Sequence, residues 1–172
     1  GKSMRILFIV PYPKNCAPSQ RLKFEQYYTI FQENGIELKH SSFYSESMWK
    51  VLYRKGYIFN KIIHVILGYF RRIRDLFNIR SYDIVYVHLW VTPIGVPIFE
   101  WFFQITSKSL VYDIDDLIFL SVPTKGVNSF FTILKGKSKP IFLMGRADHV
   151  ITCTPFLDSF VKRYNHRTTD IS

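Results

Sequence analysis

The sequence contains very little cysteine. Cys16 and Cys153 are its only two cysteines, they lie far apart, and neither belongs to a CxxC pair. A disulfide framework is therefore excluded, and a reducing compartment is the simplest interpretation. A globular chain of 172 residues buries about 70% of the surface that it exposes when unfolded, so it needs neither disulfides nor a structural metal to fold.

Long hydrophobic runs are also missing. The apolar run Ile6–Val10 is too short for a secretory signal and leads directly into Pro11. The stretches 58–70 and 91–105 are interrupted by charged residues, histidine or proline, whereas a membrane-spanning helix needs about 18 or more consecutive apolar residues. We therefore expect no transmembrane helix and a cytoplasmic location.

Acidic residues are scarce as well. Asp and Glu number 13 against 23 Lys and Arg, which gives a net charge of +10 and a pI near 9.6. Such a balance indicates an anionic partner. More than half of the excess lies between Glu46 and Arg80, a region with eight basic and two acidic residues.

Apolar residues recur in this basic region every three or four positions, which predicts one long amphipathic helix, weakened at Gly68. The residues of this stripe are Ile58, Ile62, Ile66, Tyr69, Ile73 and Phe77. Two interpretations stay open: Lys50–Arg80 lies on an anionic membrane surface, or it is a surface helix with an apolar core face and a solvated basic face. No nucleic-acid partner is expected, because no known binding motif accompanies the charge.

Short apolar runs alternate with helical patterns along the chain, and 48% hydrophobic residues is a globular composition. Strands are expected at 4–10, 36–43, 83–88, 109–112 and 149–153, and helices at 19–33, 58–77, 98–107, 127–145 (interrupted near 135–140) and 155–164. The last eight residues carry no strong signal. The alternation predicts an α/β fold, a Rossmann-like doubly wound, mainly parallel sheet with helices on both faces.

Ligands of such sheets bind at the carboxyl ends of the strands, where three aspartates follow the fourth expected strand. Asp113, Asp115 and Asp116 could bind Mg²⁺, recognise an acceptor hydroxyl or act as a general base. Alternatively they form a polar loop in which one of them caps the next segment. His88 ends the third strand beside Trp90. It could act as a base or donate a hydrogen bond to a ligand, or it could be a half-buried structural residue.

The loop after the first strand could bind a phosphate at the following helix N-terminus. It contains no glycine, so it is not a GxGxxG fingerprint, and Ser19, Gln20 and Arg21 would supply side-chain contacts instead. Alternatively Ser19 caps the helix and Arg21 is solvated. Thr154 precedes Pro155 as a helix cap at the same edge. A catalytic cysteine is not expected, because no adjacent histidine activates either thiol.

Five segments together resemble the N-terminal domain of GT-B glycosyltransferases of family 4 (group 1). They are the opening Met4–Pro11, the helix start Ala17–Arg21, Asn34-Gly35 before the second strand, Tyr82–His88 and Val111–Leu117; Ala147–Thr152 adds a sixth. The resemblance spans nearly the whole chain from Met4. It implies a retaining transferase of two Rossmann-like domains, in which this half binds the acceptor and a C-terminal domain binds a nucleotide-diphosphate sugar.

Site roles follow from the same resemblance. His88 matches the histidine after the third strand, and Asp115 falls where many members have a histidine that contacts the transferring sugar. These two would be catalytic, and substrate would be bound by Ser19, Arg21, Trp90, Asp113, Asp116 and Thr154. The resemblance implies that no metal or other cofactor is bound. It also implies a lipid-linked acceptor at the inner membrane face, as in cell-surface polysaccharide synthesis.

The expected domain division follows. Gly1–Ser3 resemble a cloning remnant, residues 4–172 form one acceptor-binding domain, and the donor-binding domain is expected beyond Ser172. Alone, this half should not catalyse transfer.

Two alternatives are kept. The first is a non-catalytic Rossmann-type module that binds a membrane surface or a partner. The second is a Mg²⁺-dependent phosphatase that uses Asp113 and Asp115, although the Gly-Thr that usually follows such a pair is replaced by Asp116-Leu117.

Overall fold

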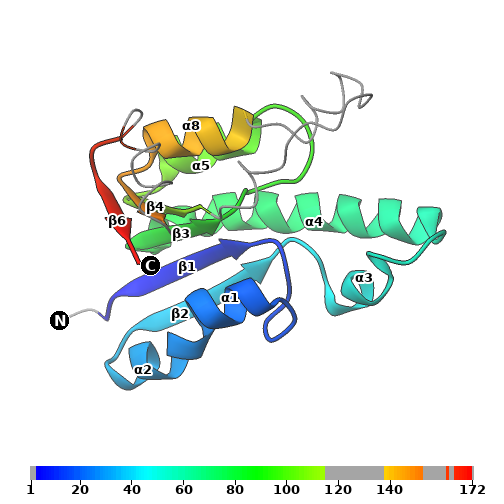
Figure 1. Cartoon of the computed structure of the whole chain (residues 1–172), viewed down its shortest axis with the longest axis horizontal. Helices are drawn as coiled ribbons and strands as arrows, with labels where there is room; N and C mark the ends of the chain where they lie inside the picture. The colour runs from blue at the N-terminus through cyan, green and yellow to red at the C-terminus, as the bar shows by residue number, and fades with distance from the viewer. Residues whose placement is uncertain (1–2, 115–137, 153–161, 163–164, 172) are drawn as a thin grey trace.

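The computed structural model describes residues 3–114, 138–152, 162 and 165–171. Its strands form one parallel sheet in the order β2-β1-β3-β4-β5-β6 (Figure 1). The strands are β1 (Arg5–Val10), β2 (Glu37–Ser42), β3 (Ile84–His88), β4 (Leu110–Asp113), β5 (His149–Thr152) and β6 (Thr168–Asp170). The helices are α1 (Pro18–Lys23), α2 (Tyr28–Glu33), α3 (Glu46–Val51), α4 (Ile58–Asn78), α5 (Ile98–Thr106) and α8 (Ser138–Arg146). The expected Rossmann-like α/β fold is confirmed.

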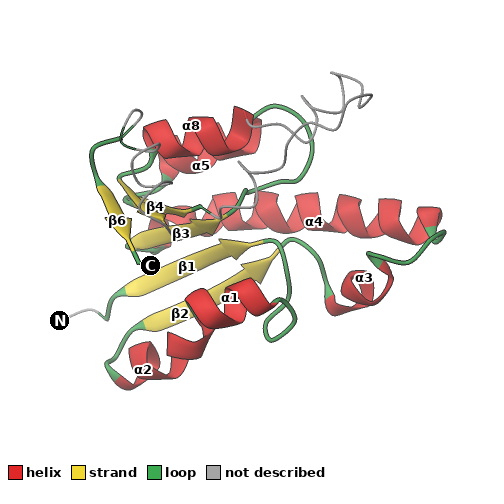
Figure 2. Ribbon diagram, viewed as in Figure 1, coloured by secondary structure: helices red, strands yellow, loops and turns green. Residues whose placement is uncertain are grey.

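Helices cover both faces of the sheet (Figure 2). The step from β1 to β2 moves across the sheet in one direction, and every later step moves in the other. Because crossovers between parallel strands are right-handed, this reversal puts α1 and α2 on one face and α4, α5 and α8 on the opposite face. The reversal at β1 and β3 is the place where such sheets bind ligands.

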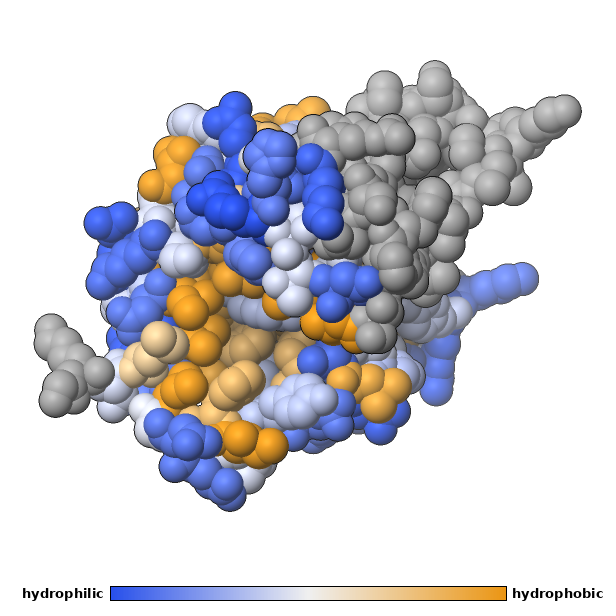
Figure 3. All heavy atoms as spheres, turned by 60° about the vertical axis from the view of Figure 1, so that its left-hand side comes forward, coloured by the Kyte–Doolittle hydropathy of each residue, from blue (hydrophilic) through white to orange (hydrophobic). Residues whose placement is uncertain are grey.

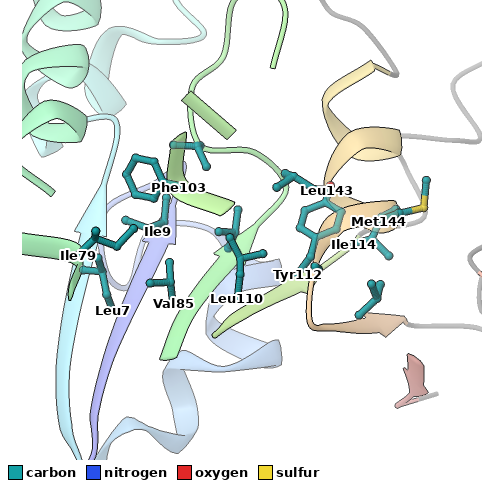
Figure 4. Close-up of a cluster of buried hydrophobic side chains, with 14 of the residues drawn as sticks. Leu7, Ile9, Ile79, Val85, Phe103, Leu110, Tyr112, Ile114, Leu143 and Met144 are labelled. Carbon is teal, nitrogen blue, oxygen red and sulfur yellow. The ribbon is translucent and has the colours of Figure 1, made fainter. Parts of the chain in front are cut away.

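Alternate strand residues supply two cores. Leu7, Val85 and Tyr112 point towards α5 and α8 and pack with Phe103 and Leu143 (Figure 4). Side chains of opposite parity pack on α1 and α2; they are Ile6, Phe8 and Val10, with Phe24 and Tyr28. Both faces of β1 are thus buried, as its continuous apolar run predicted.

The face that carries α1 and α2 is only partly covered. A hollow of about 310 Å³ is lined by strand residues such as Phe8, Tyr86 and Val111 and by Tyr27 and Phe31 beside them. Figure 3 shows hydrophobic side chains gathered in a hollow of the surface on this side. Right-handed crossovers place α4, α5 and α8 on the opposite face, so these helices leave the hollow open.

The first expected helix differs in two ways. Its N-cap is Ala17 and Pro18 is the first helical residue, so Ser19 lies inside the first turn and does not cap the helix. The helix also breaks at Phe24, whose backbone leaves helical geometry at φ −141°, and a short 3-10 turn (Glu25–Tyr27) leads into α2. The break leaves Tyr27 of the expected core stripe half-exposed, while Phe24 and Tyr28 stay buried.

The end of the chain holds an unexpected strand. Residues 168–170 pair in parallel with β5, with Thr169 opposite Ile151. The segment is short and polar, and it forms a strand by pairing with β5, so hydrophobic patterning did not reveal it. The helix expected at 155–164 and the first part of that at 127–145 lie outside the described residues.

The long helix is confirmed at Ile58–Asn78 and runs through Gly68 without a break. Its orientation contradicts the expected apolar core face. Of the predicted stripe only Tyr69 is turned towards the protein, and Ile58, Ile62, Ile66, Ile73 and Phe77 are exposed. No helix in the described part of the chain is long and apolar enough to cross a membrane.

Candidate functional site

The two central strands bring His88 and Asp113 together at the carboxyl edge of the sheet. His88 is the last residue of β3, Asp113 is the last residue of β4, and the register places them opposite each other. Both side chains are fully buried. The pairing joins a predicted catalytic residue with a predicted substrate-binding residue.

Asp113 accepts hydrogen bonds on both carboxylate oxygens. Lys23 Nζ donates to Oδ1 at 2.8 Å, while Tyr86 Oη at 2.7 Å and His88 Nδ1 at 3.1 Å donate to Oδ2. Burial alone would raise the pKa of Asp113, but the hydrogen bond and charge of His88, followed by those of Lys23, outweigh it and hold the pKa below its usual value. Asp113 is therefore an ionised anchor.

The contact with Asp113 fixes the tautomer of His88. An ionised carboxylate only accepts hydrogen bonds, so Nδ1 carries the proton of this contact and Nε2 is left for a further hydrogen bond. Within the described residues Nε2 is buried and has no hydrogen-bond partner. A buried polar atom without a partner is costly, and this one can accept a hydrogen bond from a ligand hydroxyl.

The backbone directly after His88 is strained. Leu89 has φ +68°, a left-handed conformation that costs a side-chain-bearing residue of this size on the order of 1 kcal/mol. Tyr112 Oη donates to the carbonyl oxygen of Leu89 at 2.7 Å, and the backbone N–H of Leu89 donates to Asp113 O. Strain that neighbours hold in place is characteristic of functional sites.

A buried ion pair supports the next stretch of the same turn. Glu100 Oε1 accepts from the backbone N–H groups of Val91 and Thr92, each at 3.2 Å, and lies 3.2 Å from Lys139 Nζ. Lys139 also donates to Thr92 Oγ1 at 2.8 Å. Burial lowers the pKa of Lys139, and Glu100 partly offsets this effect. The pair ties α5 and α8 to the turn that follows His88.

The loop after β1 contains no glycine and is held by side-chain hydrogen bonds. Gln20 and the backbone of Tyr12 exchange two hydrogen bonds, at 3.0 and 2.9 Å, and Glu25 accepts from Asn15 N at 2.7 Å and from Gln20 Nε2 at 3.1 Å. Ser19 is half-buried and Arg21 is exposed. Within the described residues Arg21 has no ion-pair partner.

Trp90 belongs to an aromatic cluster at the same edge. Its ring lies 5.7 Å from Phe43 and 6.0 Å from Tyr44, and Tyr44 in turn lies 6.0 Å from Tyr12. Burial raises the pKa of Tyr44 to about 12, so its hydroxyl stays neutral. Such rings offer a ligand apolar faces and hydroxyl groups together.

Three predicted site residues, Asp115, Asp116 and Thr154, lie outside the described residues, so their positions relative to His88 stay predictions. Within the described residues no three metal-ligating side chains cluster. Cys16 is half-buried, and burial raises the pKa of its thiol.

Sequence reasoning missed several polar residues of this edge. Lys23 and Tyr86 hold Asp113, and Glu25 supports Gln20 and the loop after β1. No local signal identifies Lys23, because charged residues Arg21 and Glu25 flank it on either side. Comparison of the chain with protein-family models and with curated proteins gives no match.

Proposed function

We propose that this chain is the acceptor-binding half of a retaining glycosyltransferase that moves a sugar from a nucleotide-diphosphate sugar to a glycan or lipid-linked acceptor. The observation that supports it most is the unpartnered Nε2 of His88, oriented by Asp113 at the carboxyl edge of β3. The order of sequence segments that resemble the family is the second support.

The chemistry assigns separate roles to the cluster. In the transfer, the bond between the anomeric carbon and the diphosphate oxygen breaks, and that carbon bonds to the acceptor oxygen, whose proton passes to the released diphosphate. His88 Nε2 accepts a hydrogen bond from a hydroxyl of the sugar or the acceptor and so orients it. Asp113, Tyr86 and Lys23 are positioning residues, since they act through the imidazole.

Asp113 is poorly suited to the phosphatase alternative. A nucleophilic aspartate needs one oxygen free to approach phosphorus, whereas Lys23 binds one oxygen of Asp113, and Tyr86 and His88 bind the other. The binding-module alternative is favoured by a different surface, the exposed apolar stripe of α4.

The test uses the complete protein, obtained by reading the coding sequence beyond Ser172. We expect a further ~150–200 residues of alternating strands and helices. The protein is incubated with radiolabelled nucleotide-diphosphate hexoses and a lipid extract of its own host, and transfer into the lipid fraction is measured. His88→Ala should lower transfer about 100-fold or more, and Asp115→Asn should act likewise.

The control variant is His166→Ala, which removes an exposed histidine outside this cluster and should retain full activity. Circular dichroism verifies that every variant is folded. A stop codon directly after Ser172, or wild-type turnover in folded His88→Ala, would overturn the proposal.

A further inference from the structure

The strongest unexplained feature of the molecule is the orientation of α4. The side of this helix that faces away from the protein carries nine large apolar residues with exposed fractions between 40% and 85%. They are Ile58, Phe59, Ile62, Ile63, Ile66, Leu67, Phe70, Ile73 and Phe77. Their spacing of three, four or one residue places them along a single helix face.

The opposite face of α4 carries the polar groups. Arg72 is fully buried and donates to the backbone carbonyls of Val10 at 2.8 Å and Val91 at 2.6 Å, and it pairs with Asp75 at 3.3 Å. Gly68 lies against the ring of Phe43. The helix therefore docks on the sheet through an arginine, an aspartate and a glycine, and its apolar stripe is left exposed.

Position adds to this argument. In Figure 1 the N-terminal half of α4 extends past the carboxyl ends of β1, β2 and β3, on the side of the molecule where His88 lies. At 1.5 Å per residue the helix is about 30 Å long. A contiguous apolar stripe of this length on a monomer is characteristic of an interaction surface.

The charge around the stripe is predominantly basic. From residue 47 to residue 82 the only acidic side chain is Asp75, which is buried. Exposed basic residues border the stripe; they are Lys50, Arg54, Lys55, Arg74 and Arg80. The surface is apolar in its centre and basic at its margins.

α5 adds further apolar side chains on the same face of the sheet. Tyr69 of α4 lies 5.4 Å from Phe99 of α5, so the two helices pack side by side. Trp101 and Phe102 are exposed on α5 and line a hollow of about 370 Å³ together with Phe142 of α8. Tryptophan is enriched where proteins meet the headgroup region of a bilayer.

The geometry points to an anionic lipid bilayer as the occupant: α4 lies in the plane of the membrane interface, with its apolar stripe among the acyl chains and its basic margins at the headgroups. A second copy of the chain fits less well, because a two-fold contact sets the same basic margins against each other. A bilayer with anionic lipids satisfies the apolar stripe and the charges together. This inference stands independently of any sugar chemistry.

The experiment is co-sedimentation of the 172-residue chain with vesicles of phosphatidylcholine alone, or of phosphatidylcholine and phosphatidylglycerol in equal parts. We expect binding to the anionic vesicles that weakens as salt is raised. Phe59→Ser/Ile62→Ser/Ile63→Ser should reduce the partition coefficient about 100-fold. Arg54→Gln/Lys55→Gln should reduce it about tenfold on anionic vesicles and leave binding to neutral vesicles unchanged.

The matched control is Leu22→Ser/Ile30→Ser, which removes two equally exposed apolar side chains from α1 and α2 on the other face of the sheet. It should bind like the wild type, and circular dichroism verifies the fold of each variant. Two outcomes would overturn the inference. The first is that the triple variant binds vesicles as the wild type does. The second is that the wild-type chain does not bind vesicles and sediments as a dimer, and that the triple variant is a monomer. The second outcome would make the stripe a self-association surface.

Discussion

Two of the buried charge clusters at the carboxyl edge of the sheet differ in how completely their polar atoms are satisfied. Arg72, Asp75 and Ser41 form one cluster, in which every nitrogen of the guanidinium has a partner. His88 and Asp113 form the other with Lys23 and Tyr86, and there the Nε2 of His88 has none within the described residues. The satisfied cluster holds the architecture, whereas the unsatisfied one, beside strained backbone, is where the proposed function places the ligand.

The largest expected effect of a substitution is therefore on the Arg72 cluster. Arg72→Met leaves Asp75 as a buried charge and removes the donors to the carbonyls of Val10, Ser41 and Val91. We expect the free energy of unfolding to fall by about 3–5 kcal/mol, measured by urea denaturation. Lys55→Met is the control: its side chain is exposed, and a change above ~0.5 kcal/mol there would contradict the expectation.

The His88 cluster should respond less in stability and more in function. His88→Ala removes one of three donors to Asp113, while Lys23 and Tyr86 remain. The free energy of unfolding should fall by about 2 kcal/mol, from one charge-assisted hydrogen bond and a small cavity. Urea denaturation of both variants under one condition gives the comparison, and a loss as large as that of Arg72→Met would remove the distinction between the clusters.

Gly68 tests how closely α4 approaches the Arg72 cluster. Alanine in a helix is ordinarily about 1 kcal/mol better than glycine, but a Cβ at Gly68 would lie 2.6 Å from the ring of Phe43, which is fully buried. We expect Gly68→Ala to destabilise the protein by about 1 kcal/mol net, because overpacking outweighs propensity.

Thermal unfolding measures this effect, and Phe43→Leu in the same chain should reverse part of it. A stabilised Gly68→Ala would show that α4 lies farther from the sheet.

The fold could be predicted from local patterns, and the site only in part. Apolar runs such as Met4–Val10 and the alternation with helices gave the sheet, because burial on both faces leaves a strong signal in a short segment. His88 and Asp113 could be placed at one edge because parallel strands end together. Their partner Lys23 could not be predicted, since nothing in the local sequence shows that the ammonium group of this α1 residue reaches β4.

The outward orientation of α4 escaped prediction for a related reason. A periodic stripe such as Ile58, Ile62 and Ile66 identifies one face of a helix but does not say what that face contacts. An apolar helix face usually packs on the protein core. In this chain Arg72 and Asp75 supply enough hydrogen bonds for the polar face to dock on the sheet instead. Only the arrangement in space distinguishes the two.

The smallest expected effect compares His88 with a satisfied histidine. His40 is held on both nitrogens, by Tyr28 Oη at 2.8 Å and by the carbonyl oxygen of Tyr12 at 3.1 Å. Since Nε2 donates to that carbonyl, Nδ1 accepts from Tyr28, and burial lowers the pKa of His40 below its ordinary value near 6.5. The unfolded chain therefore takes up this proton at a higher pH than the folded chain does.

It follows that the His40 contribution is constant above pH ~6.5 and that stability declines as the pH falls below that value, until the folded protein is itself protonated. One proton limits the slope to about 1.4 kcal/mol per pH unit. Urea denaturation between neutral and mildly acidic pH measures it, and His40→Asn should flatten the profile, whereas His166→Asn should leave it as it is. A profile unchanged by His40→Asn would mean that another group takes up the proton on unfolding.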